Sequence, residues 1–190
     1  MQIRLMSDLH LEFGSMNVPC GTDHETVLVL AGDVALASKP RQYTDFIDRV
    51  CNQFRHVIWI MGNHEHYGGV ITESLNKIKY ETRYCHNLSV VENEVVDIDD
   101  VSFICATLWT SFSHSNPLDT LIIQRKMNDY AQIYAEPTKT ITPETTKALH
   151  VESMQFITAA LHKAKYLNKK TVVVTHHAPS YASIPARFKG

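Results

Sequence analysis

The sequence predicts an α/β fold in which β-sheets and helices pack in layers. Short apolar runs alternate along the chain with segments of helical periodicity, and several of these runs end directly in polar residues. The composition agrees, because 44% of the residues are hydrophobic and 20% are charged, as in globular proteins. The chain of 190 residues has the length of one domain, so we expect a single domain over residues 1–190.

The apolar runs predict strands that are bounded by turn-forming or polar residues. The expected strands are Ile3–Ser7, Val27–Ala31, Val57–Met61, Val95–Ile98, Val101–Thr107 and Thr171–Thr175. The pair Asp99-Asp100 separates two consecutive runs, which predicts a hairpin inside a mixed sheet.

Three segments have the pattern of helices between these strands. Tyr43–Phe54 and Thr72–Tyr84 are the first two, and Thr142-Pro143-Glu144 opens a third with a hydroxyl cap and an early proline. Four lysines, at positions 163, 165, 169 and 170, follow the apolar face of the third helix. They could form a phosphate-binding patch, but their position favours a solvated helix end.

Charge and cysteine spacing narrow the functional classes. With 18 basic and 20 acidic residues the net charge is -2, which does not favour nucleic acid or an anionic membrane as partner. The cysteines, Cys20, Cys51, Cys85 and Cys105, are too widely spaced for a zinc ribbon or a dense disulfide framework, so reduced thiols are expected. The N-terminus lacks an apolar signal stretch, and we expect a cytoplasmic protein that is not attached to a membrane.

Polar residues typical of metal sites follow four of the predicted strands. They are Asp8, His10, Asp33, Asn63 and His176. In open α/β sheets, ligands bind outside the carboxyl ends of the strands, so these side chains are expected to meet. If the backbone there is extended, Asp8 and His10 point to the same side, because they are two residues apart.

The types of donor in this set indicate which metals would bind. Two carboxylates, one amide oxygen and two imidazoles, without a thiolate, favour Mn²⁺, with Mg²⁺, Fe or Zn²⁺ as further candidates. A site for two ions follows if Asp33 bridges them at a separation of roughly 3.5–4 Å. Gly32 and Gly62 precede Asp33 and Asn63, which predicts sharp turns or close backbone approach at both positions.

These motifs resemble those of a known family. Asp8-x-His10, Gly32-Asp33, Gly62-Asn63-His64-Glu65 and His176 match, in order, the first four motifs of the calcineurin-like metallophosphoesterases. Segments 7–13, 106–110, 127–129 and 173–179 further resemble a bacterial and phage branch of phosphohydrolases. The resemblance covers the whole chain, and it implies a sandwich of two mixed β-sheets flanked by helices.

The resemblance also implies a site and a reaction. Asp8, His10 and a bridging Asp33 would hold one divalent ion, and Asp33, Asn63 and His176 would hold the other. Metal-bound hydroxide would attack the phosphorus of a phosphomonoester or phosphodiester, in a small phosphorylated or nucleotide substrate. His64 would protonate the leaving alkoxide, since an imidazole with a pKa near 6.5 can donate a proton at neutral pH.

Two departures from the family pattern leave alternatives open. After Asp33 the sequence continues Val34-Ala35, without the Asp and Arg of the protein-phosphatase branch, which disfavours a phosphoprotein phosphatase. The family's Gly-His-x-His motif does not occur before Gly190, so the resemblance implies missing C-terminal strands and an exposed sheet edge. The alternatives are a noncatalytic binding or regulatory protein and one half of a split phosphoesterase, with self-association or a complementing C-terminal segment as the partner.

Several residues near the motifs have two readings each. Tyr67 and Trp109 could stack on a substrate base or ring, but an aromatic residue after a strand more often packs in the fold. The pair Asn128-Asp129 could border the cleft or cap a helix. Neither pair is included in the predicted site.

Overall fold

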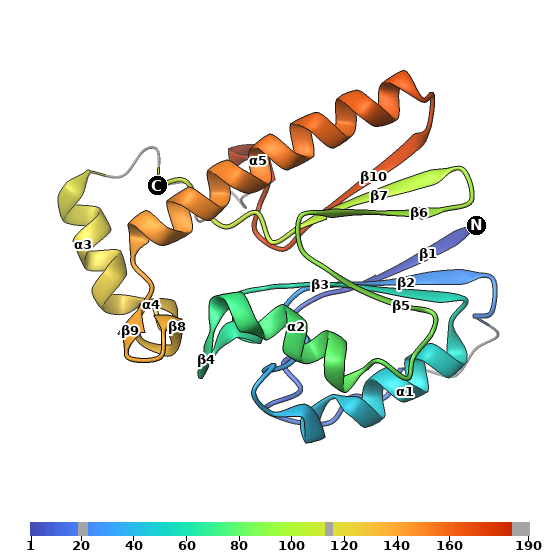
Figure 1. The fold of residues 1–190 in the computed structure, drawn as a ribbon, viewed down its shortest axis with the longest axis horizontal. Coiled ribbons are helices and arrows are strands. Elements are labelled where there is room, and N and C mark those ends of the chain that lie inside the picture. The colour runs from blue at the N-terminus through green and yellow to red at the C-terminus, as the bar shows by residue number, and fades with distance from the viewer. Residues whose placement is uncertain (19–22, 113–115, 184–190) are drawn as a thin grey trace.

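The computed structural model describes residues 1–18, 23–112 and 116–183, and it shows four layers. Helices α1 and α2 cover the outer face of one sheet, a second sheet packs on the inner face, and α5 covers the second sheet from outside (Figure 1). These helices are α1 (Thr44–Gln53), α2 (Ile71–Glu81) and α5 (Pro143–Tyr166). The predicted α/β sandwich flanked by helices is confirmed.

The first sheet contains four strands in the order β1-β2-β3-β5. The strands are β1 (Gln2–Met6), β2 (Thr26–Ala31), β3 (His56–Ile60) and β5 (Leu88–Val91). All three pairings are parallel, so this sheet is not mixed as predicted. The connections explain the difference, because α1 joins β2 to β3 and α2 lies between β3 and β5, and such crossovers return each strand in the same direction.

The second sheet contains three strands in the order β10-β7-β6, and it is mixed. The strands are β6 (Glu94–Ile98), β7 (Val101–Ala106) and β10 (Lys170–Thr175). β10 runs parallel to β7, whereas β6 and β7 form the expected hairpin across the turn at Asp99-Asp100. Asp99 has a positive φ of 54°, which aspartate tolerates better than most residues in such a turn.

Alternation along β2 distributes its side chains between two cores. Leu28 and Leu30 pack with Phe46 and Ile47 of α1, whereas Val27 and Val29 face the second sheet. All of these side chains are almost completely buried. Because both faces of β2 are covered, the strand is apolar at every position from Val27 to Ala31, which is why it forms a continuous hydrophobic run in the sequence.

A third, small sheet and two short helices were not expected from the sequence. The sheet has the order β4-β8-β9, with β4 (Gly69–Val70), β8 (Ile133–Glu136) and β9 (Lys139–Thr140). The helices are α3 (Pro117–Lys126) and α4 (Asp129–Gln132). Two-residue strands and a helix that buries none of its residues give almost no periodic signal, so composition alone could not reveal them.

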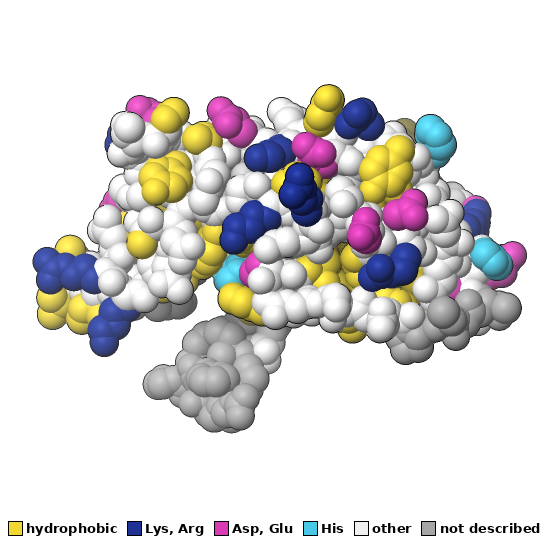
Figure 2. Space-filling model, turned by 90° about the horizontal axis from the view of Figure 1, so that it is seen from below, with side chains coloured by type: hydrophobic (Ala, Val, Ile, Leu, Met, Phe, Trp, Pro, Cys, Tyr) yellow, Lys and Arg dark blue, Asp and Glu magenta, His cyan; other side chains and the backbone are white. Residues whose placement is uncertain are grey.

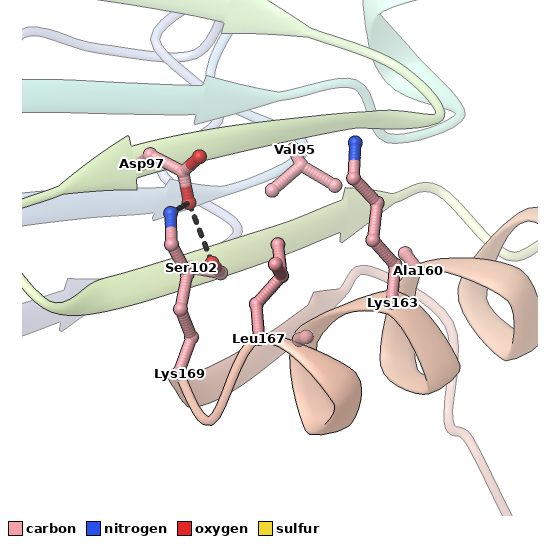
Figure 3. A pocket seen from close by; sticks show the side chains of 8 residues that line it. Val95, Asp97, Ser102, Ala160, Lys163, Leu167 and Lys169 are labelled. Carbon is pink, nitrogen blue, oxygen red and sulfur yellow. Dashed lines mark hydrogen bonds and ion pairs between the residues drawn. The ribbon is translucent and has the colours of Figure 1, made fainter.

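The lysines after the third predicted helix are partly neutralised by carboxylates. The Nζ atoms of Lys169 and Lys170 each lie 2.8 Å from a carboxylate, of Asp97 and Asp100 respectively. Figure 3 shows Lys169 and Lys163 beside the hollow between the end of α5 and strands β6 and β7. This arrangement favours a solvated helix end over a phosphate-binding patch.

The surface that α1 and α2 form carries both signs of charge. Figure 2 shows basic and acidic side chains intermixed over this face, as expected for a chain with a net charge of -2. None of the helices in the described part of the chain is long and apolar enough to span a membrane. The cytoplasmic location remains a prediction. Cys51, Cys85 and Cys105 are free thiols, and Cys20 lies outside the described residues.

Candidate metal centre

The six residues predicted for the site come together at the carboxyl ends of β1, β2, β3 and β10. Each follows the end of its strand directly or within a few residues, at the end of the molecule that carries α4 and the small sheet (Figure 1). Two groups of three residues could each hold a cation, because the ligand atoms within each group lie within 4.8 Å of one another. The first group is His10, Asp33 and His64, and the second is Asp8, Asp33 and His176. Asp33 belongs to both groups, whereas Asp8 is grouped with His176 and not, as the resemblance implies, with His10. Asp8 Oδ1 nevertheless lies 4.0 Å from His10 Nε2.

The two carboxylate oxygens of Asp33 face different histidines. Oδ2 lies 3.8 Å from Nε2 of His10, and Oδ1 lies 3.4 Å from Nε2 of His176. The side chain is 6% exposed, so it has little freedom to turn away. A carboxylate with one oxygen directed to each of two ligand clusters has the arrangement required of a bridge between two cations.

The backbone at three of these residues lies in the left-handed region. Asp8, His10 and Asp33 have φ angles of 56°, 46° and 53°, and residues 7–10 form no strand. The prediction that Asp8 and His10 share a side because their backbone is extended is therefore wrong. Backbone hydrogen bonds from Asp8 to Gly32 and from His10 to Asp33 hold the two loops together instead, and the side chains still converge, with 4.0 Å between Asp8 Oδ1 and His10 Nε2.

Gly32 and Gly62 are required because other parts of the site approach them closely. Gly32 has a φ of +86°, and a Cβ placed there would lie 2.6 Å from Nδ1 of His176. A Cβ at Gly62 would lie 2.6 Å from the backbone nitrogen of Asp33 and would also overlap its carboxylate. The sequence-based expectation of sharp turns and close approach is confirmed at Gly32, and that of close approach at Gly62.

Each of the site's imidazoles is oriented by a hydrogen bond at Nδ1. Glu12 Oε1 accepts from Nδ1 of both His10, at 3.2 Å, and His64, at 2.8 Å. The backbone carbonyl of Ala31 accepts from Nδ1 of His176 at 2.9 Å. These bonds make Nε2 the ring nitrogen that would bind a cation in both His10 and His176, which is how metal-binding histidines are usually supported.

Glu65 holds the loops after β2 and β3 together through buried hydrogen bonds. Its fully buried carboxylate accepts hydrogen bonds from the backbone nitrogens of Asp33, Val34 and Gly62, at 3.0, 2.8 and 2.7 Å, and from the indole of Trp59 at 3.0 Å. A further hydrogen bond joins the same two loops, because the backbone N–H of His64 donates to Asp33 Oδ1 at 2.9 Å. The position of Asp33 is therefore set by buried contacts.

The charges in the centre are strongly coupled. Burial alone would lower the pKa of His176, but its hydrogen bond to Asp33 and the charge of that carboxylate raise the pKa to about 9. Burial would raise the pKa of Asp33, yet the bond and charge of His176 and the N–H of His64 hold it below its usual range. Without a cation the two groups thus form an ion pair, and a cation that binds His176 must displace its proton.

Three side chains that are not part of the predicted site surround its residues. Glu12 orients two histidines, and Asp129 and Tyr67 contact Asn63. Glu12 follows His10 by two residues in the first motif, which was a usable signal. For Asp129 the sequence leaves two interpretations open, a residue at the border of the cleft or a helix cap. The structure places its carboxylate on Asn63, while Asn128 makes no side-chain cap bond.

Tyr67 and Trp109, for which the sequence leaves substrate stacking or packing open, are packed in the fold and are not available to stack on a substrate. Tyr67 is 7% exposed and Trp109 is 4% exposed. Tyr67 stacks on the ring of His64 with 4.2 Å between centroids, and Trp109 lies between the rings of His66 and His177. Burial lowers the pKa of His66 to about 4, so this histidine is neutral at physiological pH.

The residues present fit divalent cations. The donor set contains carboxylates, imidazoles and an amide oxygen, and the inward nitrogens of His10 and His176 face the shared carboxylate of Asp33. The amide oxygen of Asn63 lies 3.1 Å from Nε2 of His176, so it borders the second group of ligand atoms. The structure brings together all the predicted site residues, and their individual roles remain predictions.

Comparison with known proteins identifies the family. The calcineurin-like phosphoesterase family matches residues 1–189, and the chain belongs to this family. An uncharacterised protein of Acanthamoeba polyphaga mimivirus is 27% identical over 199 residues, a match that covers 95% of this chain and 69% of the viral protein. The phosphopantetheinyl hydrolase of Mycobacterium tuberculosis has a similar fold, with a TM-score of 0.64 at 19% identity, covering 93% of this chain and 68% of that one.

Proposed function

We propose that this chain is a phosphoesterase that uses two divalent cations, preferably Mn²⁺, to hydrolyse a small phosphomonoester or phosphodiester. The family supports the phosphoesterase class. The observation that carries the finer proposal is the placement of Asp33 between His10 and His176, one oxygen toward each imidazole. Asp8 and His10 would complete one cation site with Asp33, and Asn63 and His176 would complete the other.

The cations would supply positive charge to the phosphoryl oxygens and an activated water as the nucleophile. The chain's own residues supply orientation and a proton. His64 donates its Nδ1 hydrogen to Glu12, which leaves Nε2 as the nitrogen that can protonate the leaving oxygen. The stacked ring of Tyr67 and the edge of His10 fix the plane of His64, so the proton is presented in one direction.

Hydrolysis assays with an altered His64 test this proposal. His64→Ala should lower turnover of an alkyl phosphate ester by roughly 10²–10⁴-fold in the presence of Mn²⁺, the usual contribution of a positioned acid. The loss should be much smaller with p-nitrophenyl esters, whose leaving group needs little protonation. His162→Ala is the matched control, because His162 is exposed on α5 far from the site in sequence and fold.

Two results would contradict the proposal at different levels. An equal loss on activated and unactivated esters would reject His64 as the acid while leaving the phosphoesterase in place. The absence of hydrolysis of mono- and diesters at every Mn²⁺ concentration would instead favour the noncatalytic binding protein.

A specific feature favours the alternative of a complemented enzyme. β1 and β10 are edge strands in the described part of the two sheets, and apart from Thr175 the residues that line a groove between them are apolar. Leu5 and Val173 at this groove are 67% and 42% exposed. Unpaired edges of this kind accept a further strand, so self-association or a complementing segment remains the proposed partner interaction.

A further inference from the structure

Asn63 is held by a carboxylate from a distant part of the chain. Asp129 opens α4, in the segment between β7 and α5, and its side chain reaches the loop after β3. Its Oδ1 accepts a hydrogen bond from Nδ2 of Asn63 at 2.9 Å and one from the hydroxyl of Tyr67 at 2.6 Å. Asp129 is 4% exposed, so this contact is shielded from water.

The contact decides which way the Asn63 amide points. An ionised carboxylate only accepts hydrogen bonds, so the NH₂ group of Asn63 must face Asp129. The amide oxygen then faces the other way, 3.1 Å from Nε2 of His176. If the amide turned by 180°, its two N–H donors would face the cation site, where an oxygen is needed.

Tyr67 links the same carboxylate to the proposed acid. Its hydroxyl donates to Asp129 and accepts from Nδ2 of Asn63 at 3.4 Å, while its ring stacks on His64. One buried carboxylate therefore fixes both an amide oxygen at the cation site and the aromatic surface on which His64 rests.

We propose that Asp129 and Tyr67 are positioning residues that hold the Asn63 oxygen toward the cation site and that Asp129 specifies the orientation of this amide. The inference rests on the proposed function, because it assigns Asn63 to a cation. It adds to that function a part for Asp129 in α4, to which the resemblance of segment 127–129 assigns no role.

Calorimetric titration of the full chain with Mn²⁺ tests the inference without using activity. Asp129→Ala should weaken Mn²⁺ binding by roughly 10–100-fold, the usual effect of removing a residue that orients a ligand. Tyr67→Phe should have a smaller effect in the same direction, because Asp129 keeps its bond from Asn63. Glu136→Ala is the control, since Glu136 is an exposed acid in β8 of the same segment.

A double-substitution cycle separates positioning from a general effect on the fold. In an Asn63→Ala background, Asp129→Ala should cause almost no further loss of Mn²⁺ affinity, because there is no amide left to orient. The side-chain amide signals of Asn63 in ¹⁵N-labelled protein should also shift in Asp129→Ala without metal. A purely structural role of α4 would lower the affinity equally in both backgrounds.

The outcomes distinguish this inference from the proposed function. Unchanged Mn²⁺ affinity in Asp129→Ala, or an equal loss in both backgrounds, would overturn the inference alone. Binding of Mn²⁺ by the unaltered chain without hydrolysis of any ester would reject the proposed function and leave the inference in place. Failure of the unaltered chain to bind Mn²⁺ would overturn both.

Discussion

The two flanks of the candidate site differ in how firmly the chain holds them. On the flank of β2 and β3, Asp33 is buried and Glu65 accepts four hydrogen bonds from the surrounding loops and Trp59. On the flank of β1 and β10, the side chain of Asp8 is 58% exposed, and the neighbouring edge strands carry exposed apolar side chains. We call the side with Asp33 and Glu65 the buried wall of the site, and the side with Asp8 and the edge strands β1 and β10 its open wall.

This difference indicates how the two walls divide their roles. Residues on the buried wall hold the separation between the two ligand groups, because Asp33 belongs to both. Asp8 on the open wall belongs to one group and is reached directly from solvent. Substitutions on the first wall should therefore damage fold and site together, and those on the second should affect one cation or an intermolecular contact.

The largest effect is expected from Glu65→Ala on the buried wall. The change leaves four buried donors without their acceptor, and each such group costs about 1–3 kcal/mol, so the free energy of unfolding should fall by about 4 kcal/mol or more. Urea denaturation measures it. Glu25→Ala, at an exposed position, should change the value by less than about 0.5 kcal/mol. A small loss in Glu65→Ala would show that the wall does not depend on this carboxylate.

Removal of ligands should separate the two walls directly. Asp33→Ala should abolish Mn²⁺ binding at both ligand groups, whereas Asp8→Ala should weaken one and spare the other, because Asp33 is the carboxylate that the groups share. Metal analysis after equilibrium dialysis counts the bound ions. If Asp33→Ala retains two ions per chain, the bridging role is wrong.

A pH-dependent effect of intermediate size is expected at Glu92, behind the buried wall. Burial raises the pKa of Glu92 to about 7 from 4.5, against the opposing effect of its bonds from Thr107. The folded state therefore binds more protons than the unfolded state between these values, and the stability that protonated Glu92 contributes is lost as the pH rises through about 7. Glu92→Gln should remove this loss and add about 1–3 kcal/mol at pH 8 relative to pH 5.

Denaturation curves at several pH values check this expectation. The difference between Glu92→Gln and the unaltered chain should grow from pH 5 to pH 8, while the exposed Glu94→Gln should follow the unaltered chain. Parallel pH profiles for all three proteins would show that Glu92 ionises normally in the folded state.

The smallest effect on stability is expected on the open wall. Leu5→Lys should change the free energy of unfolding by less than about 0.5 kcal/mol, because the side chain is 67% exposed. It should nevertheless reduce concentration-dependent self-association in sedimentation velocity, since a charge on an edge strand opposes pairing. Leu118→Lys on α3, where the leucine is 64% exposed, should leave association unchanged. The same association in both variants would exclude the β1 edge as the contact.

The sequence predicted the two large sheets and the helices that cover them, because their buried residues recur with the periods of strands and helices. The strands of both large sheets that precede a motif were located within one or two residues, and the hairpin at Asp99-Asp100 was recognised. The strand β5 was not among the predicted strands, and α3, α4 and the small sheet were also missed. Their short lengths and exposed faces leave no hydrophobic period, and their positions depend on contacts between distant segments.

The residues of the candidate site could be predicted because each follows the carboxyl end of a predicted strand. The sequence located the six residues, but it could not show that Glu12 serves two histidines or that Asp129 reaches Asn63 from α4. It also suggested an extended backbone at Asp8 and His10, where the chain is left-handed. Side-chain spacing along the sequence does not specify such turns, because they arise from hydrogen bonds to the neighbouring loop.

The left-handed backbone at Asp8, His10 and Asp33 places the ligands of the site but lowers the stability of the fold. A non-glycine residue in this region carries a cost on the order of 1 kcal/mol that glycine would avoid. At the exposed Asp8, glycine would relieve the backbone and remove the ligand together with one exposed hydrogen bond, from the Ser7 hydroxyl. A lineage released from the need to bind a cation would thus become more stable by discarding Asp8, and it would lose the site long before it lost the fold.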